Sequence, residues 1–423
     1  MRPHTGLRPY LVTALLARLA GEGMAVAVVM LAMHRTGSAA QGAFVLTAWM
    51  APHVLAAPLT GALAERARDP RLFYLCALGG MAAGIAVLAA ITGRAPLPVV
   101  LAVAALGGGC GPVATGGLSG LLARLVPEET GRDRAYALDA ATYNAVSVAG
   151  PALVSVIAAL ASPAPAVLLL AISAASAAVT AAALPYGRAD AGEGESGDGT
   201  AAPGPESRRT LPADLGAGLA AMWHVRELRA VTAATSLAFV GVGGLTTTAV
   251  LLAGVRGRPD AGGVLMTALA LGALTGSLAV ARWLRSFPTR RLVPLCLTGA
   301  GLGLAAAAAA PSFAVQVALF AVAGVFEGPL LSATLRIRAD HSPPGVRAQV
   351  FTIGAGLKIS AAACGSALAG AAAGLPPQLL LLGIAALQFA AAGLHRLLRP
   401  RPRPAGKPAA RAGAPARGQR TSG

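Results

Sequence analysis

The sequence predicts an all-α integral membrane protein, with twelve transmembrane helices divided between two similar halves. Three observations predict this fold class: the composition, a series of long apolar runs and an internal repeat. Of the 423 residues, 55% are hydrophobic and only 12% are charged. An average soluble domain carries about 25% charged residues, so this chain has too few charges to cover a soluble protein of its size. The composition therefore excludes a soluble globular enzyme, and the high hydrophobicity excludes a disordered chain.

Twelve apolar runs follow one another along the chain. Each is long enough to cross about 30 Å of hydrocarbon as a helix that rises about 1.5 Å per residue. The runs are continuous and rich in alanine, whereas strands of a membrane barrel alternate between apolar and polar residues. The first run contains Arg18 and Glu22 and is longer than a signal-peptide core, so we expect it to be retained. The expected spans are 10–33, 39–63, 72–92, 97–123, 136–160, 164–184, 230–253, 261–284, 292–310, 313–335, 346–373 and 377–398.

Charge is distributed unevenly between the two ends of these runs. The net charge is +17, and arginines gather after the second, fourth, eighth and tenth runs and before the seventh. Because cytoplasmic loops are enriched in lysine and arginine, we expect both termini in the cytoplasm. The richness in alanine and arginine is typical of a GC-rich bacterial genome, which predicts a bacterial plasma (inner) membrane. Aromatic residues make up only 4%, too few for stacking on bases, so the lipid bilayer and not nucleic acid is the expected partner.

A polar, acidic stretch rich in glycine and proline interrupts the runs at residues 185–211. It predicts a flexible cytoplasmic linker between an N-terminal six-helix half (1–184) and a C-terminal six-helix half (212–398). A disordered basic cytoplasmic tail (399–423) is expected to follow. Three motif pairs recur at offsets of 213–217 residues: Gly61-Ala62-Leu63-Ala64 with Gly276-Ser277-Leu278-Ala279, Gly111-Pro112 with Gly328-Pro329, and Arg134-Ala135 with Arg347-Ala348. Such a parallel duplication of six spans is a transporter architecture.

The loop after the second run carries the most specific local pattern. It reads Gly61-Ala62-Leu63-Ala64-Glu65-Arg66-Ala67-Arg68. With the span count, the linker and the repeat, it resembles the major facilitator superfamily over residues 10–398. Glu65 replaces the family's usual aspartate, and Arg68 stands where its second glycine usually lies. The resemblance implies the family's fold of two pseudo-symmetric six-helix bundles, with Gly61, Glu65, Arg66 and Arg68 in a cytoplasmic gate.

A second segment, Ala135–Ala140 followed by Gly150-Pro151, resembles span 5 of actinobacterial drug-efflux-type members of this superfamily. On this resemblance, Asn144 stands where many of those members carry a glutamate. Asp139 lies only five residues after Arg134, so we expect it near the cytoplasmic surface, where the dipole of the first helical turn favours a carboxylate. We group Asp139 with the gate residues.

Charged residues inside the spans are the main candidates for a functional site. Each costs roughly 2.5–3.5 kcal/mol to insert at the bilayer centre, so each needs a reason to be there. Arg18 and Glu22 lie one turn apart on one face of the first span, with Glu22 near mid-membrane. Glu22 is a candidate proton or substrate site with Arg18 beside it, and the alternative is a buried structural ion pair.

The C-terminal half offers a second carboxylate near mid-membrane. Glu327 directly precedes Gly328-Pro329, where a proline is expected to free a backbone carbonyl in a span that lines the cavity of the resembled fold. Lys358 is the one lysine of the sequence that falls inside a predicted span. Its expected depth in the membrane is similar to that of Asn144 in the other half. The sequence favours proton coupling at Glu327 with Lys358 as its partner, and the alternative is that Lys358 holds Glu327 for structure alone.

These features favour a secondary active transporter that moves a small, amphipathic molecule by alternating access, with proton-coupled export as the leading interpretation. Spans rich in alanine, glycine and leucine suit an apolar solute better than a sugar. A metabolite importer or facilitator of the same fold is the alternative, and a non-transporting membrane sensor is a remote one. The sequence shows no catalytic cluster, metal-ligand spacing or Walker motif, so we expect neither an enzyme nor a cofactor. The expected partners are protons and the solute. We expect the protein to be a monomer.

Overall fold

The computed structural model describes residues 7–125, 129–186, 211–258, 261–283, 288–343 and 346–399. Within these ranges the regular elements are helices and no strand occurs, so the predicted fold class is confirmed. The predicted linker lies outside the described residues from 187 to 210, and the predicted tail does so from residue 400 onward. The structure therefore describes the helices of both predicted halves.

The helices of the N-terminal half are α1 (Leu7–Thr36), α2 (Ala39–Met50), α3 (His53–Arg66), α4 (Pro70–Ile91), α5 (Leu97–Gly109), α6 (Leu118–Leu125), α7 (Glu129–Leu160) and α8 (Pro163–Ala182). A π-helical turn, η1 (Val113–Gly117), lies between α5 and α6. The helices of the C-terminal half are α9 (Leu211–His224), α10 (Arg226–Val255), α11 (Gly262–Trp283), α12 (Thr289–Ala308), α13 (Phe313–His341), α14 (Arg347–Ala371) and α15 (Pro377–Leu398).

Within the described residues, eleven helical segments are long and apolar enough to cross a membrane. The predicted span 39–63 is not among them because it forms two shorter helices, α2 and α3, of 12 and 14 residues. The break falls at Pro52, which has no backbone N–H to continue the helical hydrogen-bond ladder. The predicted second span is therefore a broken helix, and α2 and α3 together cover its length.

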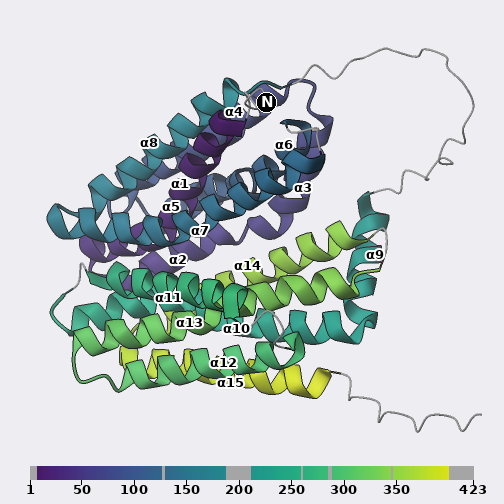
Figure 1. The fold of residues 1–423 in the computed structure, drawn as a ribbon. Helices are drawn as coiled ribbons and strands as arrows, with labels where there is room; N and C mark the ends of the chain where they lie inside the picture. The colour runs from purple at the N-terminus through teal and green to yellow at the C-terminus, as the bar shows by residue number, and fades with distance from the viewer. Residues whose placement is uncertain are drawn as a thin grey trace, which may run out of the picture.

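The two halves form two helical bundles that lie side by side (Figure 1). In the first bundle α1 packs against α8, α7 and α2, and in the second α10 packs against α14 and α15 while α11 packs against α13. Between the bundles, α2 meets α14 and α7 meets α11. The start of α1, the end of α8, the start of α9 and the end of α15 lie toward one end of the bundles, which we call the linker end. The opposite end is the distal end.

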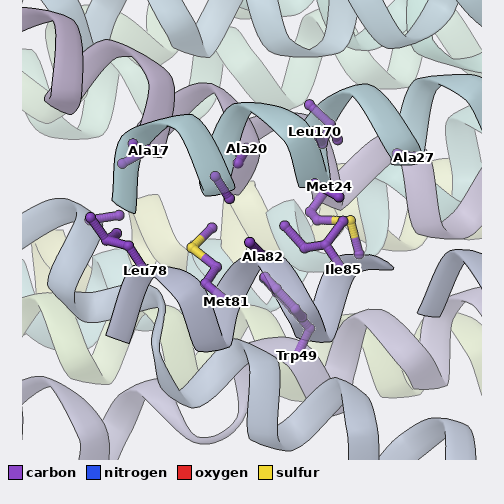
Figure 2. Packing of buried hydrophobic residues seen from close by; sticks show 14 of the residues in the cluster. Ala17, Ala20, Met24, Ala27, Trp49, Leu78, Met81, Ala82, Ile85 and Leu170 are labelled. Atoms are coloured by element: carbon purple, nitrogen blue, oxygen red, sulfur yellow. The ribbon is translucent and has the colours of Figure 1, made fainter. Parts of the chain in front are cut away.

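Small residues bring α1 into close contact with its neighbours. One face of α1 carries buried residues at three- and four-residue spacing: Ala17, Ala20, Met24 and Ala27. Figure 2 shows this face beside side chains of α4 and α8, among them Leu78, Met81, Ile85 and Leu170. A Cβ at Gly23 would meet the end of the Leu170 side chain at 2.7 Å, so a larger residue there would require that side chain to move where α8 crosses α1. This packing holds α1, which carries Arg18 and Glu22, inside the first bundle.

Four glycines interlock α11 with α13. Gly272 and Gly276 of α11 face Gly324 and Gly328 of α13, and a Cβ at any of the four would overlap a backbone carbonyl oxygen of the opposite helix. Small residues four positions apart allow such close approach of membrane helices. Because Glu327 directly precedes Gly328, this contact determines where Glu327 lies along the bundle.

Gly324→Ala should lower the thermal stability of the detergent-solubilised protein, because the new methyl group would push α13 away from the Leu269 carbonyl of α11. Overpacking costs about 1–3 kcal/mol, whereas alanine gains at most about 1 kcal/mol over glycine in a helix. Gly393→Ala in α15 is the matched control, since an added Cβ there meets nothing within 4 Å. The control should keep or gain stability. Equal melting temperatures for the wild type and Gly324→Ala would contradict the close contact.

The two bundles are joined by polar contacts near the distal end. The Ser366 hydroxyl of α14 donates to the Ala43 carbonyl of α2 at 3.0 Å, and the Thr47 hydroxyl of α2 approaches the Ala363 carbonyl of α14 at 3.3 Å. At the start of α11, a Cβ at Gly263 would overlap the Ser155 hydroxyl of α7. The structure thus holds the halves together at the distal end.

Two arginines make the same kind of contact in the two halves. Arg35, in the last turn of α1, donates from Nη1 to the carbonyls of Ala89 and Thr92 at the end of α4, at 2.6 and 3.0 Å. Arg256, directly after α10, donates to the carbonyls of Ala310 and Pro311 just beyond α12. In each half, an arginine at the end of the first long helix caps the third, which agrees with the internal repeat.

Candidate functional site

Arg18 of α1 lies at the centre of a buried hydrogen-bond network. Its Nη2 lies 2.8 Å from Oδ1 of Asp139 on α7, and its Nη1 donates to the Asp139 carbonyl at 2.9 Å. Nη1 also donates to the Thr142 hydroxyl at 2.8 Å, and Nη2 donates to the Ser119 hydroxyl at 2.9 Å. Nε approaches the Ala114 carbonyl at 3.4 Å. Arg18 is only 3% exposed, and each of its three nitrogens has an acceptor.

A π-helical turn supplies one of these acceptors. η1 (Val113–Gly117) follows Pro112, which has no backbone N–H and so disturbs the regular helical ladder. π-helical turns inside α-helices are frequent at functional sites. The Ala114 carbonyl belongs to η1, so the departure from regular α-helix lies at the point where the guanidinium of Arg18 approaches.

Asp139 does not lie in the first turn of its helix, where the sequence predicted it. The sequence predicted a carboxylate near the cytoplasmic surface and in a first helical turn, but α7 begins at Glu129, ten residues earlier. Asp139 is 7% exposed and so is buried within the bundle. Its Oδ1 accepts a hydrogen bond from the Tyr10 hydroxyl at 2.7 Å, and its Oδ2 accepts one from Ser119 at 2.8 Å. Asp139 is therefore the buried ion-pair partner of Arg18.

Glu22 is partly buried and has a different hydrogen-bond partner from the expected one. The Tyr143 hydroxyl of α7 donates a hydrogen bond to the Glu22 carboxylate, and Arg18 attracts that carboxylate electrostatically. The Arg18 guanidinium also lies 5.7 Å from the centroid of the Tyr143 ring. Tyr143 thus contacts both charged residues of α1. The side chain of Asn144, the next residue along α7, lies outside the described residues.

Glu327 is partly buried in α13, and its carboxylate lacks a direct partner among the described residues. The ammonium group of Lys358 on α14 attracts the Glu327 carboxylate electrostatically, but no ion pair between the two is described. The following Gly328-Pro329 lies inside α13, which continues through it to His341. Glu327 and Lys358 therefore interact electrostatically without a described ion pair, and the roles predicted for them remain predictions.

Lys358 contacts an aromatic ring of a third helix. Its Nζ lies 4.0 Å from the centroid of Phe239 on α10, a cation–π contact. Phe239 follows Glu22 by 217 residues, and Lys358 follows Tyr143 by 215, the same range as the offsets of the sequence repeat. An acid with a tyrosine in one half thus corresponds to an aromatic ring with a lysine in the other.

The gate residues are described only in part. Gly61, Glu65 and Arg66 belong to the last turns of α3, but their side chains lie outside the described residues. Arg68 is exposed between α3 and α4. Asp69 was not predicted as a site residue; its Oδ1 accepts hydrogen bonds from the backbone N–H groups of Arg71 and Leu72 and so caps α4. The described residues contain no group of three or more side chains suited to hold a metal ion.

Other residues of the site were not predicted from the sequence either. They are Ser119, Thr142, Tyr143 and Phe239, which supply hydrogen bonds or a ring to the charged residues. Asp139, Thr142 and Tyr143 recur at three- and four-residue spacing, which puts them on one face of α7. That spacing was the signal in the sequence that could have revealed a polar face inside a span.

Two repeated helical bundles, with charged side chains on facing helices inside an apolar protein, define the class of membrane transporters built by duplication. The chain belongs to the Major Facilitator Superfamily, whose family model matches residues 10–259 and again 231–421. The protein is therefore a membrane transporter and not an enzyme, which confirms the predicted family.

Comparison with known proteins supports the same assignment. The chain is 32% identical over 175 residues to y4rN of Sinorhizobium fredii (strain NBRC 101917 / NGR234), described as an uncharacterized MFS-type transporter. That match covers 41% of this chain and only 43% of the relative.

Among solved structures, the fold is similar to the nucleoside transporter NupG, with a TM-score of 0.73 and 12% identity over 93% of this chain and 99% of that one. It is also similar to the POT family transporter PepTSo, with a TM-score of 0.71 and 12% identity over 94% and 98% of the two chains. At these identities the similarity concerns the fold alone.

Proposed function

We propose that the protein exports a small amphipathic molecule in exchange for protons, by alternating access of a site between its two halves. The observation that carries the proposal is Glu327, a partly buried carboxylate with no direct partner among the described residues and with the charge of Lys358 nearby. A carboxylate in this position can bind and release a proton without first breaking a hydrogen bond. Asp139 lacks this freedom, because it is held by Arg18, Tyr10 and Ser119.

The residues of the N-terminal half have a different role in this proposal. The network around Arg18 is closed on itself and fixes α1 against α7. Glu22 contacts Tyr143 at the edge of that network and contributes to substrate selectivity, together with Asn144. Gly61, Glu65, Arg66 and Arg68 form the cytoplasmic gate, and the protein works as a monomer. Export rather than import follows from the resemblance of α7 to span 5 of drug-efflux-type transporters.

Transport by purified protein in liposomes tests the proposal. Liposomes loaded with a pH-sensitive dye are given an imposed pH gradient and a panel of amphipathic dyes and acids. We expect at least one solute to move against its own gradient, together with a proton flux that empty liposomes lack. Solute movement that persists unchanged after a protonophore collapses the gradient would show a facilitator instead.

Both termini are proposed to face the cytoplasm, in a bacterial plasma membrane. A reporter that is active only in the cytoplasm should therefore give a signal when fused after residue 201 or after residue 423. The same reporter inserted at residues 94–96, between α4 and α5, should give none, because that loop lies at the distal end. A silent C-terminal fusion with a detectable full-length protein would contradict the proposed orientation.

A further inference from the structure

Arg338 is a buried cation that the proposed coupling mechanism does not use. It lies in the last turns of α13 and is only 2% exposed. Its Nε and Nη2 have no hydrogen-bond partner among the described residues. Arg18, in contrast, is buried to the same degree and has an acceptor for each nitrogen. A buried guanidinium with two nitrogens that lack acceptors is unfavourable and calls for a counter-charge that the described residues do not supply.

A second cation lies next to it. The Arg338 guanidinium lies against Gly354 of α14, where a Cβ would overlap it, and Lys358 is one helical turn further along α14. That turn corresponds to about 6 Å, and the two cations repel each other. Glu327 is eleven residues from Arg338, or about 16 Å along α13, too far to neutralise it. The pair therefore carries more positive charge than its surroundings balance.

Helix α10 adds hydroxyl donors and an apolar surface beside this pair. Phe239 contacts Lys358, and Ser236 and Thr232 precede it by three and seven residues, which puts all three on one face of α10. The hydroxyl oxygens of Ser236 and Thr232 are buried and have no partner among the described residues. Unused donors, two cations and an aromatic ring thus occur on three helices that pack together, α10, α13 and α14.

We infer that Arg338 and Lys358 bind the anionic group of the transported molecule, so that the substrate class is an amphipathic organic anion. A guanidinium presents its N–H groups in a planar fork that matches a carboxylate, and the ammonium of Lys358 adds a second charge. The apolar part of such a molecule would lie against Phe239. This inference rests on the proposed transport function and adds the charge of the substrate to it.

Thermal unfolding of the purified full-length protein in detergent tests the inference without any gradient. The probes are octanoate and 1-naphthoate, each compared with its uncharged amide of nearly the same shape. A ligand at ten times its Kd should raise the melting temperature by about 3 °C. We expect that shift with the carboxylates, little or none with the amides, and its loss in both Arg338→Gln and Lys358→Gln. Arg338→Gln is expected to fold, because it removes an uncompensated buried charge.

Arg336→Gln is the matched control. Arg336 lies two residues away on α13, but it is exposed and its Nε lies 3.9 Å from Oδ2 of Asp340, so this variant should keep the full shift. The inference is overturned if neither carboxylate stabilises the wild type, if the amides do so equally, or if both substitutions at the site leave the shift intact. Because no gradient is applied, a positive result stands even where proton coupling fails, and a negative result leaves the test of coupling valid.

Discussion

Glu327→Gln should reduce transport driven by a pH gradient to the background rate of empty liposomes, while substrate binding and counterflow persist. Glutamine keeps the size and polarity of the side chain but cannot exchange a proton. Glu327 has no hydrogen-bond partner among the described residues, so the substitution should leave the packing of α11 on α13 intact. Uphill transport and substrate-for-substrate exchange, measured in the same liposome preparation, separate coupling from binding.

Glu22→Gln is the comparison variant for this experiment. Glu22 accepts a hydrogen bond from Tyr143 and lies beside the charge of Arg18, so its substitution should alter stability or substrate selectivity more than coupling. Normal uphill transport by Glu327→Gln, with loss of coupling in Glu22→Gln, would mean that the two carboxylates have the opposite roles. Normal coupling in both variants would place the proton site elsewhere in the chain.

Asp139→Ala should destabilise the protein by about 3–5 kcal/mol, the cost of leaving a buried charge without its partner. The substitution deprives Arg18 of an ion pair at 2.8 Å and leaves the hydroxyls of Tyr10 and Ser119 without their acceptor. Denaturant titration of the detergent-solubilised protein measures the loss. Asp340→Ala is the matched control, because its ion pair with Arg336 is exposed and should be worth less than about 1 kcal/mol.

The double variant Arg18→Met, Asp139→Ala tests the cause of this loss. Removing both charges avoids an uncompensated guanidinium, so the double variant should be more stable than Asp139→Ala alone. The same stability in the single and double variants would show that the hydrogen bonds to Tyr10 and Ser119, and not the charge pair, account for the effect.

Hydropathy predicted which segments form long apolar helices, but not where those helices begin and end. The predicted span 377–398 coincides with α15 because prolines stand at both of its ends, Pro376 and Pro377 at the start and Pro400 directly after Arg399. Span 5 was predicted to begin at residue 136, whereas α7 begins at Glu129. The preceding residues are charged but still helical, so an apolar run marks only the part of a helix that faces lipid or other helices. The misplacement of Asp139 follows from this difference.

The partners of the charged residues could not be predicted for a related reason. Arg18 and Glu22 are neighbours on one helix, which suggested a pair, yet Arg18 bonds to a residue 121 positions away. Which helices meet is decided by packing of small residues across the bundle, and one sequence does not reveal that packing. The predicted tenth span ends at residue 335, so Arg338 falls just beyond it. In the structure α13 continues to His341, and Arg338 is buried in its last turns.

The arginine caps at the distal end bear on how the chain inserts into its membrane. Under the proposed orientation, Arg35, Arg94, Arg256 and Arg258 must all cross the bilayer against the usual preference for cytoplasmic arginine. Each of them has a partner near the distal end: Arg35, Arg94 and Arg256 donate to carbonyls at or just beyond the C-terminal ends of α4 and α12, and Arg258 lies 5.7 Å from the centroid of the Phe313 ring. The C-terminal end of a helix carries about half a negative charge, which partly neutralises a cation bound there. The linker end and the distal end of the folded chain therefore differ more in unneutralised positive charge than a count of their arginines suggests.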